Sequence, residues 1–162
     1  MTSYAFPPGG LPDQSTSPES TAVFTPAYAV IPASVQRDIV TSFLPEWRDT
    51  RTWVLARPLT GFAETFSQYA LEIAPGGGSA RPEPDKAAQG VLFVAVGTAR
   101  LTIGEAEHDL RPGSYAYLPP ASDWSLFTTG DTPCKLHWIR KRYTPVSGLD
   151  MPPALVTHEK DV

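Results

Sequence analysis

The sequence predicts an all-β domain, a sandwich or barrel built from short strands. Runs of β-branched and aromatic residues recur about every 8 to 12 residues, with glycine- and proline-rich turns between them. The chain of 162 residues contains 18 prolines, and its 19% of charged residues lies below the roughly 25% of typical domains. Its length is sufficient for a single domain with its own core.

The elements are expected in a simple order. Residues 1–20 are rich in Pro, Gly, Ser and Thr, which predicts a flexible tail ahead of a domain over 21–162. A short helical pattern lies over 34–43, and Ala74–Gly78 and Gly104-Glu105 are predicted to be turns, the second inside a hairpin. Strands are expected over 22–31, 53–56, 62–73, 91–96, 100–103, 114–118, 124–129 and 135–143.

Two spaced motifs lie within these strands. The first begins at Gly77, continues through Glu83, Asp85 and Gly90, and closes after an apolar run at Gly97. It resembles the first motif of the cupin superfamily, which has a His-x-His pair and a glutamate between two glycines. The resemblance implies a cupin fold, a double-stranded β-helix that forms a jelly-roll barrel.

The second motif supports the same fold. It begins at Gly113, passes through the strand 114–118 to Pro119, and continues to Trp124 and Thr128. In the second cupin motif a histidine stands at the place of Trp124 and an asparagine at the place of Thr128. The two motifs together are more specific than either spacing alone.

Every metal-ligand position of the resemblance is changed, to Glu83, Asp85, Gly90 and Trp124. Imidazoles are good ligands for first-row metals, whereas glycine has no side chain and indole offers no free lone pair. We therefore expect no metal or other cofactor in this chain. Glu83 and Asp85 with water could hold a hard ion, but such sites need more ligands, and exposed acids in a proline-rich loop are the favoured interpretation.

The remaining features exclude several classes of function. A net charge of −4 argues against nucleic acid or a membrane surface as the main partner. The basic cluster at 140–142 is interpreted as a solvated strand end or a subunit contact rather than a phosphate site. A lone Cys134 is expected to be a buried, inert thiol. With no signal peptide pattern or apolar span, the protein is expected to be cytoplasmic.

Several stretches resemble one cupin family, the (S)-ureidoglycine aminohydrolases of purine and allantoin breakdown. They lie over most of the chain, at 10–12, 28–32, 60–69, 91–94 and 141–146 with Gly148. Members of that family are double cupins, and the resemblance is to the N-terminal half, which is generally degenerate at its metal positions. The resemblance implies that manganese and the catalytic residues belong to a C-terminal cupin that is absent here.

Two functions are therefore expected. In the first, the chain is the structural N-terminal cupin of such an aminohydrolase, inactive alone, with a second cupin domain or subunit and a homo-oligomer as partners. In the second, it is a metal-independent cupin that binds a small molecule near the barrel mouth through Glu83, Asp85, Tyr117 and Trp124. Neither assigns a catalytic residue to this chain.

Overall fold

The computed structural model describes residues 23–24, 28–32, 44–56 and 65–162. The predicted tail at 1–20 and the helical pattern at 34–43 lie outside the described residues. The elements are β1 Val23–Phe24, β2 Ala29–Val30, β3 Arg48–Ala56, β4 Ser67–Ser79, β5 Ala88–Val96, β6 Ala99–Ile103, β7 Ala106–Leu110, β8 Ser114–Leu118, β9 Trp124–Thr128, β10 Cys134–Arg142, β11 Leu155–His158 and the short 3-10 helix η3 Glu159–Asp161.

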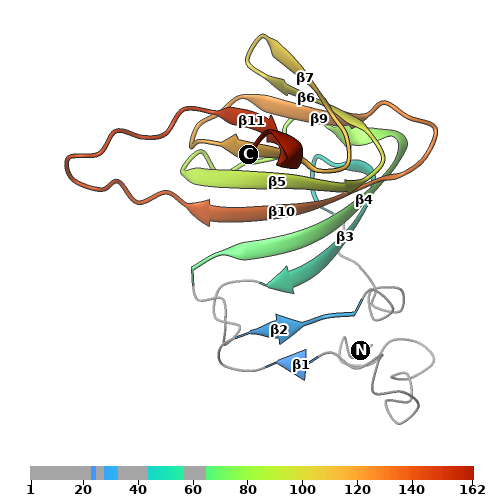
Figure 1. Cartoon of the computed structure of the whole chain (residues 1–162), viewed down its shortest axis with the longest axis horizontal. Coiled ribbons are helices and arrows are strands. Elements are labelled where there is room, and N and C mark those ends of the chain that lie inside the picture. Colours follow the sequence, from blue (N-terminus) through green and yellow to red (C-terminus); the bar gives the residue numbers. More distant parts are fainter. Residues whose placement is uncertain (1–22, 25–27, 33–43, 57–64) are drawn as a thin grey trace.

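The strands form a nearly closed barrel, so the predicted all-β class is confirmed. Nine strands share one sheet, in the order β11-β8-β5-β10-β4-β9-β6-β7 with β3 added beside β4. In Figure 1 the strands β3, β4, β10 and β5 make one layer, and β9, β6 and β7 make the other. Antiparallel pairing throughout lets each strand turn alternate side chains into the space between the layers.

Strand β4 belongs to both layers, which corrects the turn predicted at Ala74–Gly78. Its first half pairs with β10 from Ser67 to Ile73, and its end pairs with β9 through Gly78 and Ser79. The chain bends here without leaving the sheet because Gly76 and Gly78 adopt φ angles of 74° and 141°, which side chains disfavour. Thr128 Oγ1 of β9 donates to the carbonyl of Ala74 at 2.8 Å and fixes the bend.

The predicted first strand over 22–31 is wrong in detail. The structure has two short strands, β1 and β2, which pair antiparallel with Val23 opposite Val30. Strands β3 and β5 also begin earlier than predicted, at Arg48 and Ala88. Pairing with β4 and β10 extends them through polar residues, which have no hydrophobic pattern to mark them. The hairpin at Gly104-Glu105, between β6 and β7, is confirmed.

The core fills the interior of the barrel. Trp138 of β10 is its largest fully buried side chain. It belongs to one buried cluster with aliphatic residues from both layers: Leu71, Ile73, Leu92, Val94, Leu101, Leu110, Leu118, Leu126 and Leu136. The barrel is therefore a packed core and not an open cup.

Gly78→Ala should strongly destabilise the barrel. A Cβ at this position would lie 2.1 Å from the carbonyl oxygen of Leu126, a backbone atom that cannot rotate away. We expect the free energy of unfolding to fall by about 3 kcal/mol or more in urea titrations.

The matched control is Gly104→Ala. Gly104 also has a positive φ, 58°, but nothing lies within 4 Å of its Cβ position. Only conformational strain remains, so about 1 kcal/mol should be lost. Equal losses for the two variants would contradict the close packing of β4 on β9.

Candidate functional site

The four changed ligand positions meet at one end of the barrel. Glu83, Asp85, Gly90 and Trp124 all line a single pocket, where β5 begins and β9 begins. The four residues that the motif spacing predicted to be neighbours therefore lie together in the structure. Trp138, which lies outside both motifs, lines the same pocket.

Glu83 is not an exposed loop acid, as the favoured interpretation held. Its side chain is only 10% exposed, and its Oε1 accepts a hydrogen bond from Arg140 of β10 at 2.5 Å. The backbone amide of Asp85 donates to the same oxygen at 2.8 Å. Burial raises the pKa of Glu83 above its ordinary value, and the amide of Asp85 and the guanidinium of Arg140 offset part of that rise.

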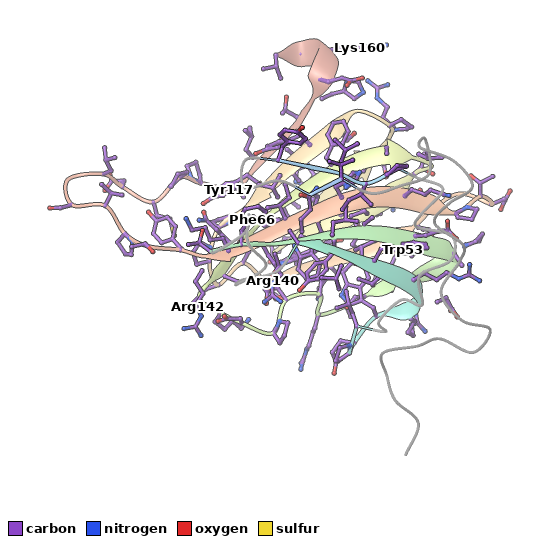
Figure 2. The ribbon with its side chains drawn as sticks, turned by 90° about the horizontal axis from the view of Figure 1, so that it is seen from below. Trp53, Phe66, Tyr117, Arg140, Arg142 and Lys160 are labelled. Carbon is purple, nitrogen blue, oxygen red and sulfur yellow. The ribbon has the colours of Figure 1, made fainter. Side chains whose placement is uncertain are left out.

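Asp85 forms a second ion pair, with Arg142 of β10. Its Oδ2 accepts from Nε of Arg142 at 2.9 Å, and its Oδ1 accepts from the amide of Ala87 at 3.0 Å. The hydrogen bonds that Asp85 accepts from the amide of Ala87 and from Arg142 hold its pKa below the ordinary value. Both ion pairs join residues 57 positions apart. Figure 2 labels the two arginines at the same end of the molecule.

The solvated strand end predicted at 140–142 is therefore wrong for Arg140, whose side chain is 24% exposed, but it holds for Arg142, which is 78% exposed although it pairs with Asp85. Alternation along β10 turns Trp138 and Arg140 inward, so the guanidinium of Arg140 is carried over the barrel end. Its carbon lies 5.4 Å from the ring centroid of Trp138, within the range of a cation-π contact. Lys141, which lies between Arg140 and Arg142 in the sequence, is exposed.

Indole rings fill the space behind the ion pairs. Trp124, 6% exposed, packs edge-on against Trp138 with ring centroids 5.9 Å apart. Gly90 makes room for this arrangement, because a Cβ there would lie 3.1 Å from Nε1 of Trp138. The glycine thus does more than remove a ligand: it admits the indole into the pocket.

The space left in the pocket is very small. Its volume is about 10 Å³, close to the roughly 10–15 Å³ that one water molecule needs. Nε1 of Trp138 is buried and has no hydrogen-bond partner in the structure. The pocket is therefore about large enough for one water molecule, and it is too small for an organic ligand unless its lining rearranges.

Tyr117 does not line this pocket. It lies on β8 between the buried Ala116 and Leu118, so its side chain points to the outer face of the sheet. Its hydroxyl donates to Oε1 of Gln89 at 2.9 Å. Burial and the neighbouring Tyr143 and Tyr115 raise its pKa. Of the four residues predicted to bind a small molecule, the structure brings together Glu83, Asp85 and Trp124.

Comparison with known families explains this geometry. The cupin domain family matches residues 70–140, which hold all four changed positions. The chain carries a cupin domain. Among curated proteins, none matches the sequence.

Solved structures extend the likeness to the whole chain. The "Putative Glyoxylate Induced Protein" from Pseudomonas aeruginosa is 50% identical, with a TM-score of 0.80, over 100% of this chain and 58% of that one. Protein Ylba from E. coli, of family DUF861, is 19% identical, with a TM-score of 0.71, over 77% of this chain and 50% of that one. At 19% identity the second likeness shows the fold alone. The matched part is 58% of the first protein's length and 50% of the second's.

The four motif positions offer few ligands to a metal. Gly90 and Trp124 have no donor atoms for one, and both carboxylates already accept hydrogen bonds from arginines. Within the part of the chain that the structure describes, no three His, Cys, Asp or Glu side chains gather to hold an ion. Likewise, no described helix is long and apolar enough to cross a membrane.

Sequence reasoning missed Trp138, Arg140 and Arg142. The alternation of residues 134–142 was a usable signal, because it places Leu136, Trp138 and Arg140 on one face. The partners of the arginines lie too far along the chain for any local pattern. Cys134 is buried as predicted, and burial raises the pKa of its thiol to about 11, which disfavours the reactive thiolate.

Trp124→Ala should remove a central part of the core. Replacing a fully packed tryptophan by alanine costs about 3 to 5 kcal/mol of unfolding free energy, because it leaves a cavity. Trp124→Phe, which keeps a ring, should cost clearly less. A loss within about 0.5 kcal/mol for the alanine variant, typical of surface substitutions, would mean that the ring is not packed in the barrel.

The ion pairs should respond to pH in opposite ways. Glu83 has a raised pKa in the folded protein, so folding favours its protonated form. Relative to Glu83→Gln, the wild type should therefore gain stability as the pH falls from 7 toward the ordinary value of 4.5. Urea midpoints measured across this range test the sign.

Asp85→Asn is the control for this experiment. The pKa of Asp85 is lowered from its ordinary value of 3.8, so its contribution is lost only as the pH falls below that value. The difference between wild type and Asp85→Asn should stay constant from pH 7 to about 5. If the wild type instead lost stability relative to Glu83→Gln over this range, the Arg140 contact would outweigh burial.

Proposed function

We propose that this chain is the metal-free, structural cupin of an (S)-ureidoglycine aminohydrolase-like protein. In that role it supports a second cupin, which holds manganese and the catalytic residues. The complete protein would convert ureidoglycine and water to ureidoglycolate and ammonia. The chain itself contributes a rigid barrel and a surface on which the second cupin packs.

One observation carries this proposal: the place of the metal is filled by protein. Two indoles occupy the interior, and two ion pairs cover it, so every group at the four motif positions has a structural partner. A catalytic cupin needs an open coordination position and a route for substrate. A pocket of about 10 Å³ is too small to admit a substrate, and two of its four motif positions have no donor atom for a metal.

The assignment to this particular family is supported by sequence and by length. The resemblance covers stretches over most of the chain, and it is to an N-terminal half. The Pseudomonas aeruginosa protein, 50% identical to this chain, extends well beyond the matched 58% of its length. That extra length leaves room for a further domain of similar size.

Binding of a small molecule in the barrel is the second candidate. Glu83, Asp85 and Trp124 share the pocket with Trp138, whose buried N–H has no hydrogen-bond partner. A ligand would have to displace Glu83 from Arg140 to enter. This candidate predicts a saturable ligand that quenches tryptophan fluorescence, whereas the structural role predicts none.

The proposed function is tested by metal content and by ammonia release from freshly generated ureidoglycine. The isolated chain should retain well under one equivalent of manganese, zinc, iron or nickel after dialysis. With added manganese it should release no ammonia above the uncatalysed rate, because nothing in it replaces the charge stabilisation of a metal.

The longer Pseudomonas aeruginosa protein is the comparison, assayed at equal molar concentration. It should bind manganese and release ammonia. Turnover by the isolated chain within about tenfold of that protein would contradict the structural role. Absence of ammonia release from both would contradict the aminohydrolase assignment.

A further inference from the structure

The segment between β10 and β11, residues 143–154, is an arm that projects from the barrel. Figure 1 shows it extending past the end of the sheet before it returns to β11. Its apolar side chains are unusually exposed: Val146 by 59%, Leu149 by 70% and Met151 by 48%. No heavy atom lies within 4 Å of the Cβ position of Gly148 at its tip.

The arm has a defined shape although little packs against it. The amide of Leu149 donates to the carbonyl of Val146 at 3.2 Å, which closes a turn at the tip. At one base the amide of Tyr143 donates to the carbonyl of Ala87 at 2.9 Å, and at the other β11 pairs with β8. Prolines at 145, 152 and 153 restrict the backbone further. A preformed arm loses little entropy on docking, and its apolar tip favours burial.

The same chain presents a matching surface on the outer side of the barrel, which we call the outer face. Phe93 and Val96 of β5 and Ile139 of β10 are 36%, 49% and 37% exposed. They are neighbours in the sheet, because Phe93 pairs with His137 and Ile139 pairs with Val91. Tyr115 of β8 continues the outer face, opposite Phe93.

A second copy of the chain is the occupant that these surfaces fit. The arm is anchored at both bases and runs past the sheet end, so it does not cover its own outer face. In a two-fold dimer the arm of each copy contacts the outer face of the other copy. The dimer therefore contains two equivalent contacts, and each buries one arm and one outer face. The charges agree. The only charged residue of the arm is Asp150, whereas the exposed charged residues of β10 are basic: Lys135, Lys141 and Arg142. Lys135 already pairs with Glu72 and Arg142 with Asp85, so Lys141 is the complement to Asp150.

From these observations we infer that the chain forms a two-fold dimer in which the arm of each copy docks on the outer face of the other. The inference rests on the proposed function only because that function gives the barrel a structural role. It adds another copy of the chain as a partner, beside the second cupin of the proposed function, and names the surface between the two copies.

Sedimentation equilibrium of the isolated chain tests the dimer. We expect a monomer–dimer equilibrium below about 100 µM, and Leu149→Asp or Phe93→Asp should each raise the dissociation constant at least about tenfold. Val162→Asp is the matched control, because Val162 is 96% exposed and belongs to neither surface. It should leave the dimer unchanged.

Thermal unfolding by circular dichroism shows whether each variant is folded. Leu149→Asp should keep the wild-type barrel because its side chain lies on the exposed tip. If Phe93→Asp does not fold, Phe93→Ser replaces it. A wild-type chain that remains monomeric, or a dimer that Leu149→Asp leaves intact, would overturn the inference without touching the metal and ammonia results.

Cross-linking distinguishes docking on the outer face from contact between the two arms. Chains carrying Leu149→Cys and Phe93→Cys are mixed and treated with a short bismaleimide, to which the buried Cys134 is inaccessible. A link between positions 149 and 93 supports the proposed arrangement. Links only between two copies of position 149 would overturn it, since the arms would then meet each other.

Discussion

The indole of Trp138 occupies the centre of the barrel, and the rest of the site is arranged around it. Trp47, Tyr69 and Trp124 surround it with ring centroids 5.8, 5.5 and 5.9 Å away. Aromatic rings bury large areas and prefer such tilted or edge-on contacts, so the four rings act as one rigid unit. Because this unit spans β4, β9 and β10, it joins both layers of the barrel.

The aromatic unit also determines what the barrel end can do. It fills most of the interior beside the motif positions, and it places the guanidinium of Arg140 above the ring of Trp138. Glu83 then loses much of its hydration and is compensated by Arg140 and a backbone amide. Breaking such a partly buried pair by removing one partner is costly, because it leaves the other charge poorly compensated. The carboxylates at the motif positions thus take part in contacts that hold the barrel end together.

A barrel that is closed at this end has its interaction surfaces outside. Exposed apolar side chains lie on the arm, on the outer face and at the chain's peripheral strands, and not in the pocket. This distribution suits a cupin whose role is to hold a partner barrel in place. Tyr117, which was predicted to lie near the barrel mouth, is instead on the outside of the barrel, where its hydroxyl donates a hydrogen bond to Gln89.

Local patterns in the sequence were sufficient for the class of fold and for most strands. Alternation and turn residues located β6, β8, β9 and β10 to within about two residues, since strand pairing there follows the apolar pattern. They failed at β4, where glycines keep a bent strand in the sheet and resemble a turn. They also missed β11, a short strand that depends on the edge of β8 for its hydrogen bonds.

The contacts of the candidate site also divide into those that the sequence predicted and those that only the structure revealed. The sequence by itself determined that Glu83, Asp85, Gly90 and Trp124 stand where a cupin carries its ligands, because that information lies in residue type and spacing. Only the tertiary structure decided that the carboxylates pair with Arg140 and Arg142 and that Trp138 enters the space beside Gly90. Each of these contacts joins residues about 50 positions apart in the chain, and the antiparallel pairing of β5 with β10 is what brings them together.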